Sequence, residues 1–219
     1  SSRARGIRSG VFVADVLVAE PGGPDSVVFD DAAAIGRILE LIARGDPAAD
    51  AVVVIDGPSG AGKSTLAGAL VDAWPTGGPA PQLLSTDALV PGWDGLADGS
   101  AALGAVLGEF IAARTSGRDV PWRAWDWAAD RPGETRFLRP DRPVIVEGSG
   151  SLTEETAELA TVSVWVELRD EGERRARALE RDGDVYAPHW ERWAAQEAAH
   201  RRQHAPRRLA DLVLDRTPR

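Results

Sequence analysis

Cysteine is absent from the 219-residue sequence. A chain without thiols can form no disulfide, no thiolate zinc site and no cysteine nucleophile, and this fits a cytoplasmic protein. The sequence also lacks a signal-peptide pattern and any apolar run of about 18 residues or more. We therefore expect a protein that neither spans nor crosses a membrane.

Lysine is nearly absent: the sequence has one lysine, Lys63, and 24 arginines. Acidic residues outnumber basic ones, and the formal net charge is −9. That charge argues against sequence-independent binding to nucleic acid, whose phosphates would be repelled. A small anionic substrate remains compatible with it, since a local cluster of arginines could bind one. The hydrophobic content of 43% is that of an ordinary globular domain with a sizeable core.

The single lysine belongs to the run Gly-Pro-Ser-Gly-Ala-Gly-Lys-Ser over residues 57–64, which matches the phosphate-binding pattern G-x-x-x-x-G-K-[ST]. An apolar run over 51–55 precedes it, and a helical stretch rich in alanine and leucine follows it. Such a loop aims backbone N–H groups into one concave space at the positive end of the helix dipole. We therefore expect nucleotide phosphates there. A tight turn that binds nothing is the alternative interpretation.

Each residue type in this phosphate loop has a chemical role. Glycines let the backbone turn and approach the phosphates, Lys63 reaches the β- and γ-phosphate oxygens, and Ser64 offers a hydroxyl to Mg²⁺. The candidate nucleotide-binding residues are Gly57, Ser59, Gly60, Ala61, Gly62, Lys63, Ser64 and Thr65.

From residue 51 onward, short apolar runs alternate with helical stretches, a pattern typical of an α/β domain with a mostly parallel sheet. The predicted strands are 51–55, 82–86, 143–146, 162–166 and 210–214, and the predicted helices are 63–73, 101–116, 153–160, 170–182 and 188–204. We therefore predict a three-layer fold over residues 51–219, with a mostly parallel five-stranded sheet and helices on both of its faces.

Residues 1–50 precede this domain as an N-terminal strand-helix extension. We expect a strand over 11–18 and a helix that Asp30 or Asp31 caps, that runs to about Arg44 and that stops at Gly45-Asp46-Pro47. The extension is expected to pack on the core domain as an edge hairpin or as a dimer surface, so a homodimer is one expectation. The sequence assigns no chemistry to these residues.

Carboxylates follow three of the predicted strands. Asp56, Asp87 and Glu147 each stand directly after an apolar run, and ligands of open α/β sheets lie at the carboxyl ends of the strands. Ser64 could bind Mg²⁺ directly, with Glu147 or Asp56 acting through water. Asp87 is then free to accept the proton of an attacking hydroxyl. Helix caps or turn residues are the alternative interpretation for Asp87 and Glu147.

Several of these segments together resemble the uridine kinase-like branch of the P-loop kinases. The resemblance rests on residues 55–67, the Ser85-x-Asp87 step, the run 144–148 and the arginine-rich stretch 170–182, and it covers about residues 50–215. It implies a five-stranded parallel core, ATP with Mg²⁺ as the phosphoryl donor, Asp87 as the base and a mobile lid that carries arginines. Residues 88–94 depart from the aromatic-rich step that the family usually has there, which leaves the acceptor open.

Arginines are concentrated in the predicted helix 170–182. Arg174, Arg177 and Arg181 stand at positions i, i+3 and i+7, so they share one face and could clamp a transferring phosphoryl group. The alternative is a solvated helix with ion pairs between Glu171 and Arg175 and between Glu173 and Arg177, both at i, i+4.

Tryptophans are concentrated in the segment 121–127, and their alternation with charged residues does not fit a single buried face. An aromatic face could stack on a ring of the acceptor while the charges orient its hydroxyls. In the resembled family this stretch corresponds to the acceptor-binding insertion, and Asp126 is the matching carboxylate. The candidate acceptor residues are Asp87, Trp93, Trp122, Arg123, Trp125 and Asp126. A roof over the core is the alternative interpretation.

Two histidines, His200 and His204, stand at i, i+4 on a predicted helix, with Glu197 one turn earlier. Such spacing can hold zinc, but a third ligand and the His-Glu-x-x-His pattern are lacking, which favours a solvated amphipathic helix. We expect His189, Trp190 and Trp193 to serve packing.

The sequence favours a kinase that transfers the γ-phosphoryl group of MgATP to a hydroxyl of a small acceptor, most plausibly nucleoside-like. A nucleoside monophosphate kinase is an alternative, in which arginines hold the acceptor's phosphate, with Arg123, Arg131, Arg136 and Arg139 as candidates. A third hypothesis is an ATPase or nucleotide-binding switch without a small acceptor. A guanine-specific N-K-x-D motif is excluded, because the only lysine lies in the phosphate loop.

Overall fold

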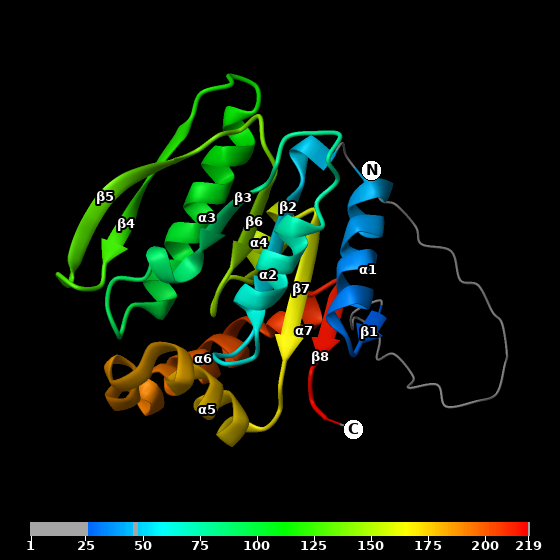
Figure 1. Ribbon diagram of the computed structural model, residues 1–219. Coiled ribbons are helices and arrows are strands. Elements are labelled where there is room, and N and C mark those ends of the chain that lie inside the picture. Colours follow the sequence, from blue (N-terminus) through cyan, green and yellow to red (C-terminus); the bar gives the residue numbers. More distant parts are fainter. Residues whose placement is uncertain (1–25, 46–47, 219) are drawn as a thin grey trace, which may run out of the picture.

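The computed structural model describes residues 26–45 and 48–218. Its main sheet has six strands in the order β1-β8-β7-β2-β6-β3, and all neighbouring strands in it are parallel (Figure 1). The strands are β1 (Ser26–Val28), β2 (Val52–Asp56), β3 (Gln82–Ser85), β6 (Val144–Glu147), β7 (Val162–Glu167) and β8 (Leu212–Asp215). The five predicted strands are confirmed, and β1 adds a sixth at the edge.

The central strands are apolar because both of their faces are buried. Every residue of β2, β6 and β8 is buried, as is expected of parallel strands that helices cover on both sides. Successive residues of β2 alternate between the two faces: Val53 and Ile55 belong to one core cluster, and Val52 and Val54 to the other.

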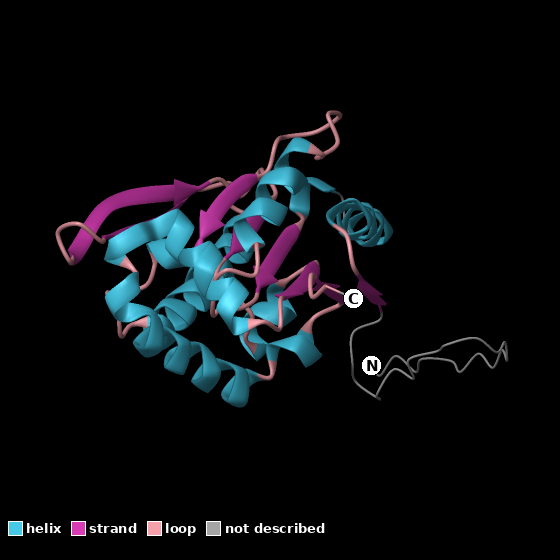
Figure 2. Cartoon of the chain, turned by 60° about the horizontal axis from the view of Figure 1, so that its bottom comes forward, coloured by secondary structure: helices cyan, strands magenta, loops and turns pink. Residues whose placement is uncertain are grey.

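Helices form the two outer layers, as predicted (Figure 2). Isoleucines and leucines of α1 and α2 pack on one face of the sheet, and those of α3, α4 and α7 pack on the other. The helices are α1 (Asp31–Arg44), α2 (Lys63–Asp72), α3 (Leu96–Ala113), α4 (Glu154–Leu159), α5 (Glu171–Asp182), α6 (Trp190–His204) and α7 (Pro206–Leu209). Short 3₁₀ turns stand at η1 (Ala48–Asp50), η2 (Thr86–Ala88), η3 (Gly183–Val185) and η4 (Ala187–His189).

Helix α3 is long and apolar enough to cross a membrane by length and composition alone. In the structure its Leu103, Leu107 and Phe110 are fully buried in the core cluster that covers one face of the sheet. Its apolar character is therefore explained by packing within this domain.

The helix predicted near the N-terminus is confirmed. Asp30 caps it, because its Oδ1 accepts a hydrogen bond of 2.8 Å from the backbone N–H of Ala33. Ile38 and Ile42 enter the same core as α2, and β1 pairs with β8, so residues 26–44 extend the sheet and core of the main domain. The strand predicted over 11–18 lies outside the described residues.

A second sheet stands apart from the first. It is an antiparallel hairpin of β4 (Val120–Asp126) and β5 (Arg131–Leu138), which was not predicted. Its first residues alternate strictly: Val120, Trp122 and Ala124 are buried, whereas Pro121 and Arg123 are exposed. The tryptophan-rich segment does therefore have one buried face, with the period of a strand.

Helices α5 and α6 lie across the carboxyl ends of the parallel strands, at the bottom of Figure 1. A third core cluster holds them there, built from Val90, Leu96, Ala178, Tyr186, Trp190 and Trp193. The phosphate loop, which follows β2, lies at this same end of the sheet.

Candidate active site

The phosphate loop joins β2 to α2 and is packed tightly against its neighbours. Gly60 has a positive φ of 77°, and a Cβ on it would lie 2.1 Å from the carbonyl oxygen of Arg174 on α5. Only glycine satisfies both conditions, so the motif's glycine is needed for the approach of α5 as well as for the turn. Lys63 and Ser64 then begin α2.

Lys63 is held across its own loop. The side chain is buried at 8% exposure, and its Nζ donates to the carbonyl oxygen of Pro58 at 3.2 Å and to Ser149 Oγ at 3.3 Å. Ser149 comes just after β6, next to Glu147. The lysine ammonium is thus fixed between the segments that follow β2 and β6.

Ser64 and Glu147 meet at the end of β6. Ser64 Oγ donates to Glu147 Oε2 at 2.9 Å, and the Glu147 carboxylate is buried. A hydroxyl and a carboxylate fit Mg²⁺, which takes one or two protein oxygens and completes its shell with water and phosphate oxygens. Within residues 26–45 and 48–218, no group of three or more histidine and carboxylate side chains is placed to hold a metal, so a closed protein cage is not built here.

The Asp56 carboxylate accepts hydrogen bonds from backbone N–H groups. Its Oδ1 accepts from the N–H groups of Gly57 at 2.6 Å and Gly150 at 3.0 Å, and its Oδ2 accepts from Leu152 N–H at 3.0 Å and lies 3.0 Å from His200 Nε2. Both oxygens are occupied at a position only 1% exposed. The structure therefore does not bring Asp56 into the cleft that Ser64 and Glu147 line, and it holds the loop instead.

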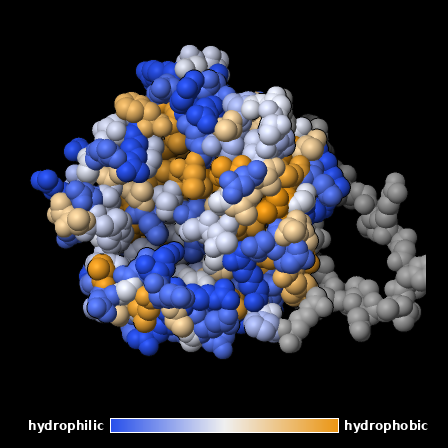
Figure 3. Space-filling model, viewed as in Figure 1, coloured by the Kyte–Doolittle hydropathy of each residue, from blue (hydrophilic) through white to orange (hydrophobic). Residues whose placement is uncertain are grey.

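A cleft of about 510 Å³ opens beside the phosphate loop. Figure 3 shows the molecule hollowed between the helices at the bottom of the view and the body above them. One part of the wall is polar and the other aromatic; its lining residues are Ser59, Ser64, Ser85, Asp87, Trp93, Trp127, Glu147, Arg181, Asp182, Val185, Tyr186 and Trp193.

Asp87 is the carboxylate at the polar end of this cleft. It lies in the turn η2 directly after β3, and its exposed side chain lines the cleft. Its partial removal from solvent raises the pKa of Asp87 to about 6, with Lys63 opposing and Glu147 reinforcing the shift. A carboxylate of this pKa is mostly ionised at neutral pH and is well matched to accept a proton.

Four aromatic side chains form the other end of the cleft: Trp93, Trp127, Tyr186 and Trp193. The Trp93 ring stands 5.0 Å from that of Trp127 in an edge-to-face arrangement, and His189 stacks on it at 4.1 Å. Trp127 Nε1 also donates to the backbone oxygen of Asp87 at 2.9 Å. This bond ties the end of the hairpin to the residue proposed as base.

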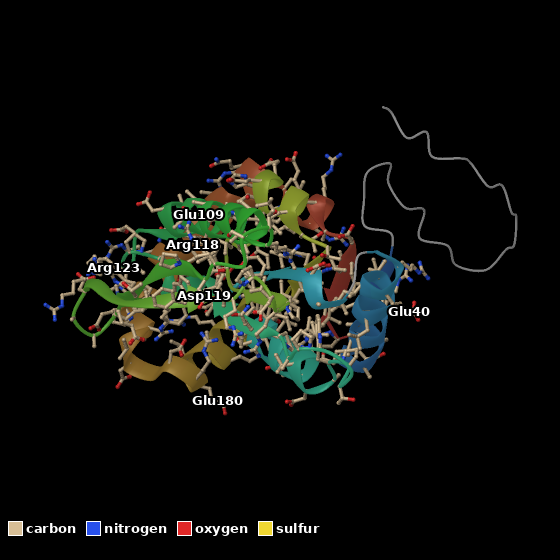
Figure 4. The ribbon with its side chains drawn as sticks, turned by 90° about the horizontal axis from the view of Figure 1, so that it is seen from above. Glu40, Glu109, Arg118, Asp119, Arg123 and Glu180 are labelled. Atoms are coloured by element: carbon tan, nitrogen blue, oxygen red, sulfur yellow. The ribbon has the colours of Figure 1, made fainter. Side chains whose placement is uncertain are left out.

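The other candidates in the tryptophan-rich segment do not line the cleft. Trp122 is buried in the core cluster under the hairpin, and Trp125 lines a separate surface hollow. Arg123 donates to the backbone oxygen of Gly133 at 3.2 Å and points outward in Figure 4. Asp126 accepts from the N–H groups of Ala128 and Ala129 and so closes the hairpin turn. Only Trp93 and Asp87 of the predicted acceptor residues line the cleft, and Trp127 joins them.

The three lid arginines take two different positions. Arg177 and Arg181 line a second pocket of about 190 Å³ together with the loop; its other lining residues are Gly60, Gly62, Lys63, Ser64, Thr65, Ala178 and Arg216. Arg174 is buried behind the loop instead, and its Nη1 donates to the backbone oxygen of Ser59 at 3.3 Å. The predicted Glu173–Arg177 ion pair is also present, at 2.6 Å.

Helix α6 contributes two buried residues that were expected in a solvated helix. Glu197 is 4% exposed, and its Oε1 accepts from Ser59 N–H and Ser59 Oγ at 2.8 Å and from Ser149 Oγ at 2.7 Å. His200, three residues later, is the partner of Asp56. The expectation of a solvated face is therefore wrong here, although the spacing of Glu197 and His200 did place them on one face. His204 bonds to Glu154 at 2.6 Å.

No protein-family model and no curated protein matches the sequence. Solved structures do match the fold. A protein from Silicibacter sp. TM1040, provisionally named a fructose transport system kinase, is 21% identical with a TM-score of 0.59, and the match covers 85% of this chain and 99% of that one. A protein from Bacillus stearothermophilus, provisionally named a uridine kinase, is 18% identical with a TM-score of 0.57, over 84% and 98% of the two chains. The chain thus shares the fold of these two structures, which is the fold that its resemblance to the uridine kinase-like P-loop kinases implied.

Proposed function

We propose that this protein is a phosphotransferase that moves the γ-phosphoryl group of MgATP to a hydroxyl of a small, nucleoside-like acceptor. The main observation in support is that the small pocket over the phosphate loop adjoins the larger aromatic cleft. Ser64 and Arg181 line both the small pocket over the phosphate loop and the larger aromatic cleft. A phosphate bound on the loop would therefore meet a hydroxyl bound in the cleft at these two side chains.

The smaller pocket suits the phosphate chain of the donor. The phosphate loop supplies backbone N–H groups, and Lys63, Arg177 and Arg181 supply positive charge on the same side. Phosphoryl transfer depends on positioning and on charge stabilisation, which this set of groups provides. Mg²⁺, held by Ser64 and Glu147, would supply further charge neutralisation.

The larger cleft suits the acceptor. Asp87 stands at its polar end, where it can take the proton of a hydroxyl that attacks in line with the loop. The four aromatic rings at the other end suit a flat, weakly polar ring, since tryptophan and tyrosine faces stack on such groups. A nucleoside or a similar ring-bearing alcohol combines both features.

An unphosphorylated acceptor is favoured over a nucleoside monophosphate. Arg123, Arg131, Arg136 and Arg139 are exposed on the hairpin or just after it, and none of them lines the cleft. Arg181, which does line it, is paired with Asp182 at 2.6 Å. A second phosphate in the cleft would thus meet the carboxylates of Asp87, Glu147 and Asp182, and among the described lining residues the one cation is Arg181, which the donor's phosphates would also need.

The proposal is tested by following ATP consumption with Mg²⁺ over a panel of nucleosides, nucleoside monophosphates, sugars and other alcohols, with a control that has no acceptor. We expect nucleosides or related ring-bearing alcohols to raise turnover well above the control. Turnover that is the same with and without every compound would contradict the kinase and favour an ATPase or a nucleotide-binding switch. Stimulation by sugars alone would contradict the ring-bearing acceptor.

A further inference from the structure

The N-terminal helix α1 brings a carboxylate to the phosphate loop. Asp31 is its first residue, directly after the cap Asp30. Ala34, Ile38 and Ile42 bury the helix against α2 and the neighbouring strands, so the position of Asp31 relative to the loop is fixed by the core. In Figure 1, α1 and the end of β8 lie side by side at one edge of the sheet.

Arg216 connects that carboxylate to the loop. It follows β8, and its backbone N–H continues the ladder by donating to Glu167 at 2.8 Å. Its Nε and Nη2 donate to Asp31, with contacts of 3.1 Å and 2.6 Å to Oδ1 and 2.6 Å to Oδ2. Its Nη1 donates to the backbone oxygens of Ala61 at 3.2 Å and Gly62 at 3.0 Å. Each of the three guanidinium nitrogens thus has at least one hydrogen-bond acceptor.

The guanidinium also lies in direct contact with Gly62. A Cβ at that position would stand 1.6 Å from Arg216 Nη1, and Gly62 has a positive φ of 96°. Any side chain there would expel the arginine as well as strain the turn. The glycine that precedes the motif's lysine is therefore needed for this contact.

The two carbonyl groups that accept from Arg216 belong to the peptides whose N–H groups are those of Gly62 and Lys63. A carbonyl that accepts a hydrogen bond from a cation becomes more polarised, and the N–H of the same peptide becomes a stronger donor. Arg216 also lines the pocket that holds Lys63, Arg177 and Arg181. Its charge therefore acts on the same space as the loop's donors.

We propose that Asp31 and Arg216 form a positioning pair for the nucleotide's phosphate chain, with Asp31 holding the guanidinium and Arg216 holding and polarising the loop. This inference rests on the proposed function, because it takes the loop to be the phosphate site. It makes the N-terminal helix, to which the sequence assigns no chemistry, a part of the nucleotide site.

The test compares ATP affinity, by calorimetry, in the whole protein and in Arg216→Ala, Arg216→Lys and Asp31→Asn. We expect Arg216→Ala to weaken ATP binding about 10-fold or more, since charge-assisted hydrogen bonds are lost, and Arg216→Lys to recover only part of it, since an ammonium cannot make the same fork. The double variant Asp31→Asn/Arg216→Ala should bind ATP no more weakly than Arg216→Ala alone, because Asp31 acts through Arg216. The KM for the acceptor should stay unchanged.

Glu40→Gln is the matched control, because Glu40 lies on the outer side of α1 and pairs with Arg37 and Arg44 at the surface (Figure 4). Inorganic triphosphate, measured in parallel, reports on the loop without base or sugar. A wild type that binds neither ATP nor triphosphate would overturn both the proposed function and the pair. A wild type that binds both, with Arg216→Ala and Asp31→Asn within twofold of it, would overturn the pair alone. If Arg216→Ala does not fold, Asp31→Asn decides, with an expected weakening of severalfold.

Discussion

Asp87 is the residue on which the proposed chemistry depends most. Replacing it with asparagine keeps the shape and removes the base, so we expect Asp87→Asn to lower phosphoryl transfer about 100-fold or more. ATP affinity should stay nearly unchanged. Single-turnover transfer and ATP binding by calorimetry check this, with Asp119→Asn as the control, since Asp119 is exposed and does not line the cleft. Unchanged transfer would remove Asp87 as the base.

The pKa of Asp87 predicts a pH dependence. Because the cleft raises that pKa to about 6, the base is ionised above this pH and protonated below it. The value of kcat/KM should therefore be level above about pH 7, reach half of that level at about pH 6, and approach a tenfold fall per pH unit below about pH 5. A profile of kcat/KM over pH 4.5–8 measures this. A profile in which kcat/KM begins to fall only near pH 4 would indicate that a carboxyl group with an ordinary pKa is the base.

Arg181 stands where the two compartments meet, so it should act on the transferring group. We expect Arg181→Ala to lower kcat at least about tenfold while it weakens ATP binding much less, because the charge that it faces develops in the transition state. Arg175→Ala is the matched control, since Arg175 is an exposed arginine of the same helix. Equal losses in kcat and in ATP affinity would indicate that Arg181 contacts bound ATP and does not stabilise the transition state specifically.

At the scale of elements, the unit from β2 through the phosphate loop to α2 could be predicted because its signals are contiguous. An apolar strand, a glycine-rich turn and a helical stretch follow one another within residues 51–72. The carboxylates Asp87 and Glu147 could be placed by the same logic, since Glu147 ends β6 and Asp87 lies in the turn that follows β3. Side-chain contacts made across the fold carry no such local signal. Glu197 bonds to Ser59 across 138 positions in the sequence, and no local pattern in either segment predicts this contact.

The β4–β5 hairpin shows why the acceptor side was harder to predict. Buried and exposed residues alternate there with the period of a strand, and Trp122 and Ala124 face the core, whereas Trp122 was predicted to contact the acceptor. The first residues of α3 were also not predicted, because the helix was expected to begin at residue 101 and begins at Leu96. Its first turns contain Asp98, Gly99 and Ser100, which favour loops, yet Gly99 lets the helix lie against Val90.

The hairpin should influence the acceptor through Trp127. We expect Trp127→Phe, which keeps an aromatic ring and removes the hydrogen bond to Asp87, to raise the acceptor KM or lower kcat severalfold without changing ATP affinity. Trp125→Phe, on the same strand but outside the cleft, should leave all three constants unchanged. Steady-state kinetics with both substrates varied check this. Equal effects of the two variants would show that the hairpin acts through general packing.

At the scale of the whole molecule, the sheet places two chemically different compartments side by side. The net charge is −9, yet Lys63 and three arginines gather at the small pocket over the loop. The neighbouring cleft is aromatic and acidic. Helix α6 joins the two, because it carries Trp193 in the cleft and Glu197 on the loop. A cationic pocket beside an aromatic cleft fits the transfer that we propose.

The most direct test of this account follows the γ-phosphate itself. The protein is given ATP labelled in that group, Mg²⁺ and a mixture of ring-bearing alcohols, and the labelled products are separated and identified. We predict that the label moves into a phosphate ester of one such alcohol and that Asp87→Asn nearly abolishes this transfer. Label that appears only as inorganic phosphate, at the same rate with and without every alcohol, would contradict the account.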